Sequence, residues 1–315
     1  MDRPALVAHA KDSIAKGSRS FALASRLFDR ETRERAWLLY AWCRKCDDLA
    51  DGQDHGRGMS VIDDAADRLG YLKGMTDAAW NGTVTGEPAF DGFGVVAREC
   101  GIPRRFADDV IAGFALDTEE WRPRSENDLY RYCYHVAGAV GCMMAVVMGV
   151  DADDEATLDR ACDLGLAFQL ANIARDLAED DAAGRCYLPM EWLAEFDIPP
   201  GQHLKPPFRP ALVAMGKRLA DASERYEASA RVGAEALPLR SRWAVLAAAG
   251  IYGDIAREVR ARGAHAWDHR VHTGKREKLL WVARARAQAG ASVEPVGREG
   301  LWNRNSLSQT SSFRA

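Results

Sequence analysis

The sequence lacks any hydrophobic run long enough to cross a bilayer. The longest uncharged and mostly apolar stretch, residues 136–150, has fifteen residues, whereas a transmembrane helix needs about 20. The N-terminus also lacks the basic and then apolar segments of a secretory signal peptide. We therefore expect a cytoplasmic protein that spans no membrane, and we expect residues 136–150 to form a buried helix.

Neither sign of charge is in large excess, and the cysteines form no disulfide pattern. The 315 residues include 42 basic and 46 acidic ones, with a net charge of −4, which leaves no basic footprint for nucleic acid. The seven cysteines are scattered and odd in number, as is usual in a reducing compartment. Cys43 and Cys46 have no second cysteine pair to complete a zinc site, so we expect them in the core or in the wall of a site.

Several motifs that would indicate other enzyme classes are missing. The chain has no G-x-x-x-x-G-K-[ST] phosphate loop, no G-x-S-x-G nucleophile turn and no E-x-x-H pair, the last of which helical di-iron proteins require. Residues 92–97 formally match a dinucleotide fingerprint. However, residues 86–88, Gly-Glu-Pro, do not form the preceding strand that such a site needs. We therefore expect no nicotinamide cofactor.

Strand signals are nearly absent, and apolar residues recur at helical spacing through most of the chain. Prolines and glycines separate the helical segments. The pattern predicts one large all-α domain over residues 1–290 and a polar, disordered tail over residues 291–315, where the periodicity is lost. The predicted helices cover residues 3–16, 19–28, 31–51, 59–80, 89–100, 103–118, 126–149, 153–182, 189–195, 208–235, 238–262 and 275–289.

Aspartates gather at two places that are far apart in the chain. Residues 47–51 read Asp-Asp-Leu-Ala-Asp, and residues 172–181 place Asn172, Asp176 and Asp180 one turn apart on one helical face. Two such faces opposite each other would offer the oxygen ligands that Mg²⁺ and Mn²⁺ prefer. A metal held in this way usually bridges to phosphates, which indicates a site for diphosphates. The candidate metal ligands are Asp47, Asp48, Asp51, Asn172, Asp176 and Asp180.

A solvated acidic face is the alternative explanation for each cluster. The first cluster, however, ends a helix that is apolar over residues 36–43, and Gly52 follows it as a stop signal. Negative charge there opposes the helix dipole by about 0.3–1 kcal/mol per charge, and like charges one turn apart add to this cost. Bound cations would reverse both effects, which favours a metal site.

Arginines lie close to both clusters in the sequence. Arg44 precedes Asp47 by three residues, Arg175 adjoins Asp176, and Arg185 follows the second cluster. Pairing within the helix, worth a few tenths of a kcal/mol (about 0.2–0.5), would explain these positions. A guanidinium beside metal-binding carboxylates can also clamp a diphosphate through two hydrogen bonds, and both explanations stay open for Arg44 and Arg175.

Four segments between about residues 11 and 285 resemble the squalene/phytoene synthase family, most closely its bacterial phytoene synthases. The segments are residues 17–21 (Gly-Ser-Arg-Ser-Phe), 40–51 (from Tyr40 through the first aspartate cluster), 132–141 (Tyr-Cys-Tyr-His-Val-Ala-Gly-Ala-Val-Gly) and 164–189 (through the second cluster). One departure is Phe114, which stands where the family often has methionine before the central helix. The resemblance implies that Phe114 would reshape the pocket wall, which leaves the preference for chain length open.

The resemblance implies an all-α isoprenoid-synthase bundle with a central cavity. It also implies an enzyme, a prenyltransferase, that joins two geranylgeranyl diphosphates head to head through a cyclopropyl diphosphate into phytoene, with Mg²⁺ or Mn²⁺ and without a reductant. The residues it assigns to catalysis are Tyr40, Arg44, Asp47, Asp48, Asp51, Asp176 and Asp180. The residues it assigns to substrate binding are Ser18, Arg19, Ser20, Phe21, Tyr132, Val136, Ala137, Gly138, Gln169, Asn172, Arg175, Arg185 and Tyr252.

Two other functions stay open beside this one. The same chemistry on farnesyl diphosphate would give squalene or dehydrosqualene. A relative without activity that only binds prenyl lipids is the other alternative, against which both aspartate clusters argue because they are intact. Since the substrates and product are greasy, we expect contact with a membrane surface, on its inner face, without a spanning helix.

Overall fold

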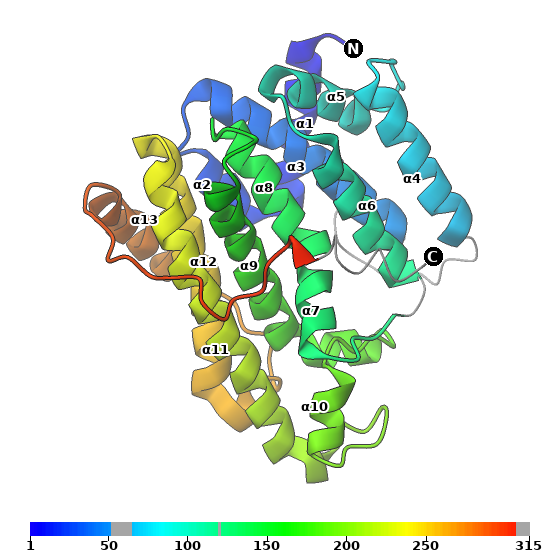
Figure 1. The fold of residues 1–315 in the computed structure, drawn as a ribbon, viewed down its shortest axis with the longest axis vertical. Coiled ribbons are helices and arrows are strands. Elements are labelled where there is room, and N and C mark those ends of the chain that lie inside the picture. The colour runs from blue at the N-terminus through cyan, green and yellow to red at the C-terminus, as the bar shows by residue number, and fades with distance from the viewer. Residues whose placement is uncertain (52–64, 119–120, 307–315) are drawn as a thin grey trace.

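The computed structural model describes residues 1–51, 65–118 and 121–306. Within these residues every regular element is a helix, which confirms the predicted all-α class (Figure 1). The α-helices are α1 (Arg3–Gly17), α2 (Arg19–Ser25), α3 (Arg30–Asp51), α4 (Ala65–Trp80), α5 (Pro88–Cys100), α6 (Arg104–Thr118), α7 (Glu126–Cys133), α8 (Ala139–Val147), α9 (Glu155–Ala182), α10 (Met190–Glu195), α11 (Arg209–Gly233), α12 (Leu239–Arg262) and α13 (Lys275–Ala289).

Most helices begin and end within three residues of the predicted positions, at the expected stop and start signals. Helix α5 is an example. Pro88 stands at its start, where a missing N–H costs nothing, and Gly101 ends it in the left-handed conformation with φ of 66°. One predicted helix, 59–80, begins partly outside the described residues, and α4 is described from Ala65 onward.

Helix α9, with 28 residues, lies at the centre of the bundle beside α8, α11 and α12 (Figure 1). It begins at Asp154, whose side chain accepts a hydrogen bond from the Thr157 N–H. Leu158, Leu166 and Leu170 on α9 are fully buried, and each such side chain contributes about 1.5–3 kcal/mol to folding. The helix that carries the second aspartate cluster is therefore fixed by its own apolar side chains.

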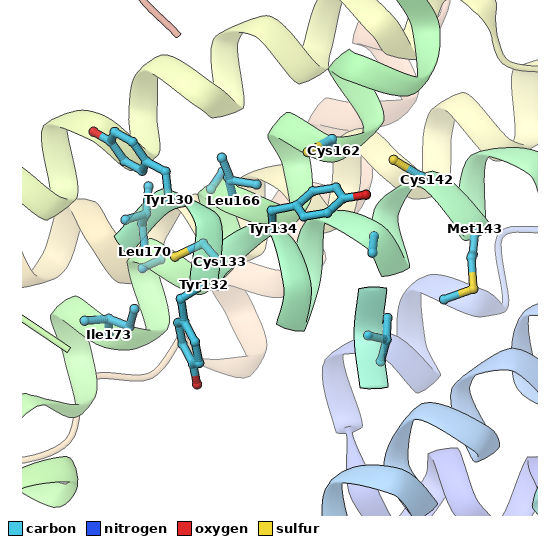
Figure 2. Close-up of a cluster of buried hydrophobic side chains, with 14 of the residues drawn as sticks. Tyr130, Tyr132, Cys133, Tyr134, Cys142, Met143, Cys162, Leu166, Leu170 and Ile173 are labelled. Carbon is cyan, nitrogen blue, oxygen red and sulfur yellow. The ribbon is translucent and has the colours of Figure 1, made fainter. Parts of the chain in front are cut away.

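The segment predicted as one helix over residues 126–149 contains a π-helical turn, η1 (Tyr134–Gly138), between α7 and α8. Such turns add a residue and rotate the side chains that follow, often at functional sites. Successive tyrosines here point in different directions, with the Tyr132 hydroxyl turned away from Tyr134 (Figure 2). Glycines allow close packing: a side chain at Gly165 would overlap the Ala137 carbonyl, and one at Gly138 would meet Cys162 at 2.9 Å.

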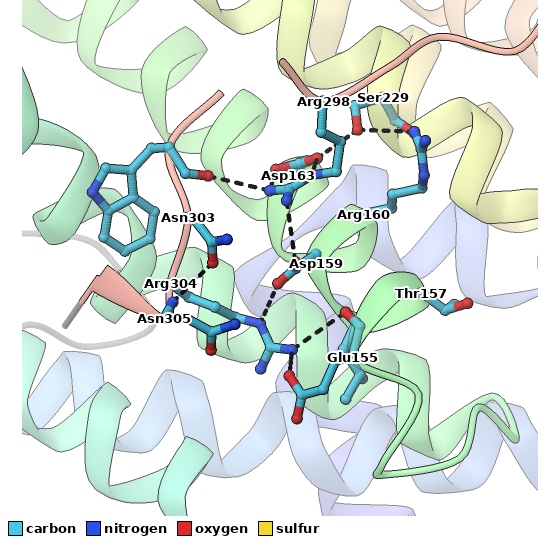
Figure 3. A network of polar contacts seen from close by, with 12 residues as sticks. Glu155, Thr157, Asp159, Arg160, Asp163, Ser229, Arg298, Asn303, Arg304 and Asn305 are labelled. Carbon is cyan, nitrogen blue, oxygen red and sulfur yellow. Dashed lines mark hydrogen bonds and ion pairs between the residues drawn. The ribbon is translucent and has the colours of Figure 1, made fainter. Parts of the chain in front are cut away.

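For the last part of the chain the sequence predicts a disordered tail over residues 291–315, and this stays a prediction. The structure describes this segment up to Ser306, where it contacts α9 through Arg298 and Arg304 (Figure 3) and α11 through the Trp302 N–H, which donates to the Tyr226 hydroxyl. Arg298 contacts Asp163 and Asp159, and Arg304 contacts Asp159 and Glu155. Of these carboxylates Asp163 is buried and Glu155 is exposed, and hydrophobic periodicity does not reveal such long-range ion pairs. Residues 307–315 lie outside the described part.

Candidate active site

A cavity of about 730 Å³ lies beside α9, between helices α2, α3 and α12 and the π-helical turn. It extends along α9 at least from Ala161 to Asp176, which at 1.5 Å per residue is about 22 Å. The sequence-predicted residues that line it are Ser18, Phe21, Tyr40, Arg44, Asp47, Tyr132, Val136, Ala137, Gln169, Asn172, Arg175, Asp176, Asp180, Arg185 and Tyr252. The fold therefore brings residues from all four of the family-like segments, together with Tyr252 of α12, to one chamber.

Carboxylates from two helices face the polar end of this cavity. Asp47 belongs to the last turns of α3, and Asp176 and Asp180 lie one turn apart on α9. The Arg175 Nε donates to Asp176 Oδ1 at 2.7 Å, and the Arg44 Nη1 lies 2.5 Å from Asp47 Oδ2. The predicted pairing of these arginines with the neighbouring aspartates is thus present. Arg44 and Arg175 also line the cavity, and their role as a diphosphate clamp stays a prediction.

Asp180 is the carboxylate whose environment opposes ionisation most clearly. Burial, followed by the negative charge of Asp176, raises the pKa of Asp180 to about 7, although Arg185 acts in the opposite direction. A divalent cation between the two groups would favour their ionised forms. Within the described residues, no three Asp, Glu, His or Cys side chains converge as a metal site. The donor set is nevertheless the oxygen-rich one that Mg²⁺ takes.

Two buried polar atoms in the same region form no well-aligned hydrogen bond within the described residues. These are the Tyr40 hydroxyl and the Arg44 Nε, which belong to neighbouring side chains that interact with each other. A side chain at Gly17 would overlap the Tyr40 hydroxyl, so the glycine at this position lets Tyr40 reach the cavity. Buried polar groups almost always find a hydrogen-bond partner. A bound anion such as a diphosphate would supply the acceptors for both.

Aromatic rings surround the part of the cavity next to these donors. Phe168 stacks on Tyr252 with ring centroids 4.4 Å apart, and Phe21 lies 5.4 Å from Tyr252 and 6.2 Å from Tyr40. Phe21 is placed by the start of α2, where the Ser18 hydroxyl caps the helix by accepting from the Phe21 N–H at 3.3 Å. The faces of such rings attract cations and exclude water.

A second aromatic group lies where Asp117 meets the cavity wall. Tyr132 stacks on Tyr187 at 4.8 Å and on Trp121 at 5.6 Å. Both tyrosine hydroxyls donate to Asp117 Oδ1, at 3.0 Å from Tyr132 and 3.1 Å from Tyr187. Burial raises the pKa of both tyrosines far above their ordinary value, so they remain neutral donors and hold the carboxylate in place.

Five predicted site residues are not placed on the cavity wall. Asp48 lies 3.7 Å from the Arg44 Nη1 but does not line the cavity, and neither does Ser20. Gly138 packs against α9, so its role in the structure is close helix contact. The side chains of Arg19 and Asp51 lie outside the described residues.

The structure adds three residues that sequence reasoning did not assign to the site: Asp117, Phe168 and Arg270. The Arg270 Nη2 lies 3.0 Å from Asp176 Oδ2 although 94 residues separate them. Its loop is held on α9 by Trp267, whose indole N–H donates to the Ala174 carbonyl at 2.9 Å. The signal for Phe168 was available, because it stands four residues before Asn172 on the same helical face.

Comparison with known proteins supplies the family. The model of the squalene/phytoene synthase family matches residues 14–277. The chain belongs to this family. The phytoene synthase of Pseudescherichia vulneris and the 15-cis-phytoene synthase of Pantoea ananas are each 45% identical to it over 309 residues, which cover 96% of this chain and 99% of each relative. The 15-cis-phytoene synthase of a Paracoccus strain is 43% identical over 307 residues, covering 95% and 98%.

Solved structures of the family share the fold. A dehydrosqualene synthase in complex with a ligand superposes with a TM-score of 0.80 at 26% identity, over 90% of this chain and 96% of that one. A squalene synthase from Alicyclobacillus acidocaldarius has a TM-score of 0.71 at 21% identity, over 83% and 95%, and shows the fold alone. This squalene/phytoene synthase family member is a prenyltransferase of isoprenoid biosynthesis. Within its described residues no helix is both long and apolar enough to cross a membrane.

Proposed function

We propose that this prenyltransferase condenses two molecules of geranylgeranyl diphosphate head to head into phytoene, through a cyclopropyl diphosphate and with release of diphosphate. The observation that carries the proposal is the cavity of about 730 Å³, in which aspartates and buried donors meet at one end of a long, mostly apolar chamber. The relatives that match almost the whole chain are phytoene synthases, which supports this product among those of the family.

The polar end of the cavity would bind the two diphosphates. Arg44 and Arg175 offer donors where they also contact Asp47 and Asp176, and Tyr40 lines the same cavity. Arginine suits this task because its planar group makes two parallel hydrogen bonds to phosphate oxygens. Asn172, Arg185 and Tyr252 are further contacts on the same wall.

The acidic residues fit Mg²⁺ or Mn²⁺, because two carboxylates one turn apart on α9 face the same chamber as Asp47. Asp47, Asp51, Asp176 and Asp180 would hold the metal, and Asp48 and Asn172 are further candidate ligands. When bound, the metal stabilises the negative charge that develops on the leaving diphosphate. Arg44 and Arg175 would add to this stabilisation from the protein side.

The body of the cavity would hold the prenyl chains and protect the cations. Loss of diphosphate from the first substrate leaves an allylic cation, which the double bond of the second substrate attacks. The rings of Phe21, Tyr40, Phe168 and Tyr252 lie next to the donors, where they stabilise positive charge and keep water away. Ala137 and Val136 on the π-helical turn line the apolar part.

The final cation would lose a proton, so no reductant is needed. Residues 92–97, which formally match a dinucleotide fingerprint, lie inside α5 and follow no strand within the described residues. A nicotinamide site there would need a strand and a phosphate-binding turn. Residues 92–97 therefore do not form a nicotinamide site of this kind.

Condensation of farnesyl diphosphate to dehydrosqualene is the second candidate. The likeness to the solved dehydrosqualene synthase favours it, and Phe114, which is 7% exposed and lines the cavity, could shorten the chamber. The phytoene synthases are nearer in sequence and match a larger share of the chain. We therefore favour geranylgeranyl diphosphate as the substrate.

A cytoplasmic enzyme that works at the inner membrane surface fits this chemistry. Both the substrate and the hydrocarbon product partition into lipid, so contact with the bilayer would shorten their transfer. Alkaline carbonate should release the enzyme from membranes, whereas resistance to this treatment would indicate an integral anchor and contradict the proposal.

The decisive assay supplies geranylgeranyl or farnesyl diphosphate with Mg²⁺ or Mn²⁺, with and without NADPH, and separates the products by chromatography. We expect phytoene from geranylgeranyl diphosphate in the absence of NADPH. A clear preference for farnesyl diphosphate, or a product that appears only with NADPH, would overturn the assignment. Complete lack of turnover with binding retained would favour the non-catalytic alternative.

A further inference from the structure

Helix α13 exposes an apolar strip to the outside of the molecule. Leu279 and Leu280 are 62% and 55% exposed. Ala283 and Ala287 follow at intervals of four residues from Leu279, which places them on the same outer face, and both are exposed. Large apolar side chains exposed next to each other commonly mark a surface that binds a partner or a membrane.

Basic residues flank this strip. Helix α13 contains five basic residues and one acidic residue, Glu277, although the whole chain carries a net charge of −4. Arg276, Arg284 and Arg286 are exposed, and none of them forms an ion pair within the described part of the chain. Arg276, Arg284 and Arg286 therefore present positive charge that no carboxylate among the described residues pairs with.

The inner face of α13 is firmly attached to α12, so the strip is not needed for packing. Trp281 lies directly on Gly250, where any side chain would overlap its ring, and its indole N–H donates to Asp254. The Trp243 indole N–H donates to the Val282 carbonyl at 2.8 Å. The helix is thus a rigid platform on the edge of the bundle (Figure 1).

This platform adjoins the polar end of the cavity. The loop that precedes α13 carries Arg270, which contacts Asp176 inside the cavity. The same loop is held to α12 by Thr273, whose hydroxyl donates to the Ile251 carbonyl at 2.7 Å, next to Tyr252. Only four residues, 271–274, lie between Arg270 and the start of α13 at Lys275.

We propose that the outer face of α13, formed by Arg276, Leu279, Leu280, Ala283, Arg284 and Arg286, is the surface with which the enzyme sits on an anionic lipid bilayer. An interfacial helix of this kind combines leucines that enter the headgroup region with arginines that attract anionic lipids. The proposal rests on the proposed function, because apolar substrates and an apolar product would pass between the cavity and the bilayer.

The test is co-sedimentation of the full chain with phosphatidylcholine vesicles that contain or lack phosphatidylglycerol. Two variants address the surface: L279Q/L280Q removes the apolar contact, and R276Q/R284Q/R286Q removes the charge. The control K73Q/V84Q changes an exposed lysine and an exposed valine at α4 and the turn that follows it, on the other side of the bundle. Circular dichroism confirms that each variant is folded.

We expect the unchanged enzyme and the control to bind the anionic vesicles. The leucine variant should lose about tenfold in partition coefficient, and the arginine variant should lose both the preference for phosphatidylglycerol and the sensitivity to salt. All variants should turn over detergent-dispersed geranylgeranyl diphosphate at an unchanged rate. The two assays separate the two proposals. If the unchanged enzyme forms no phytoene in detergent but still binds vesicles, the proposed function fails and the membrane surface stands.

Three results would overturn the proposal. One is that the unchanged enzyme does not bind anionic vesicles. Another is that both surface variants bind as well as the control. The third is that light scattering shows a dimer that L279Q/L280Q dissociates while vesicle binding stays the same, which would make this face a contact between two copies of the chain.

Discussion

Replacing Arg298 should destabilise the protein strongly, although this residue lies in the polar segment that follows the last helix. Its guanidinium binds Asp163 through Nε and Nη2, both at 2.8 Å, and the Asp163 side chain is 0% exposed (Figure 3). The Ser229 hydroxyl also donates to this carboxylate. In an Arg298→Met variant, a buried carboxylate would keep one neutral donor and lose its positive partner.

The expected loss follows from the burial of the pair. Removal of one partner from a buried ion pair costs about 3–5 kcal/mol, because the remaining charge is left without compensation. Since Arg298 itself is 19% exposed, we expect the lower part of this range. Urea unfolding followed by circular dichroism measures the difference directly. The double variant Asp163→Asn/Arg298→Met should recover most of the loss, because no buried charge remains.

The loss should also depend on pH. Burial raises the pKa of Asp163 above its ordinary value, and Arg298 opposes this effect. A carboxyl group with a raised pKa holds more protons in the folded than in the unfolded chain, so stability falls as pH rises above about 4. Without Arg298 the pKa of Asp163 would be higher still, so the fall should continue to higher pH and be larger in total. A cost below about 1 kcal/mol at neutral pH, or no recovery in the double variant, would refute the reasoning.

Other consequences concern the cavity. Asp47→Asn and Asp176→Asn should each remove most turnover and leave the helical circular dichroism spectrum unchanged, because loss of a charge relieves repulsion; full activity of either variant in EDTA would contradict the metal site. Gly17→Ala should displace Tyr40 and lower kcat with little change in thermal stability, and an unchanged kcat would show that the Tyr40 position is not critical. Ala137→Phe should raise kcat/KM for farnesyl diphosphate relative to that for geranylgeranyl diphosphate, by a factor that corresponds to about 1–3 kcal/mol. An unchanged ratio of the two values would show that this wall does not limit chain length.

Hydrophobic periodicity predicted the helices well, because each helix buries one face against its neighbours. It did not predict the π-helical turn Tyr134–Gly138, since a shifted hydrogen-bond pattern leaves no trace in the order of apolar residues. It also gave no sign that Arg298 and Arg304 form ion pairs with α9. Their carboxylate partners Asp163 and Asp159 are 135 and 145 residues away in the chain.

The site was predictable where its residues recur at helical intervals. Asp176 and Asp180 follow Asn172 by one and two turns, so sequence spacing alone placed them on one face. Arg270 has no such relation to them, because only the docking of Trp267 on α9 brings its loop to Asp176. Gly138, which the family resemblance assigns to substrate binding, packs closely against Cys162 and Leu166 of α9 in the structure.

The central claim is that two geranylgeranyl diphosphates are joined without a reductant. The most direct measurement is an incubation of purified enzyme with only geranylgeranyl diphosphate and Mg²⁺. Mass spectrometry identifies the hydrocarbon formed, and the amount of diphosphate released is determined in parallel. Our account predicts phytoene and two diphosphates for each hydrocarbon formed. A prenyl alcohol with one diphosphate for each substrate consumed, or a hydrocarbon that forms only from farnesyl diphosphate, would contradict it.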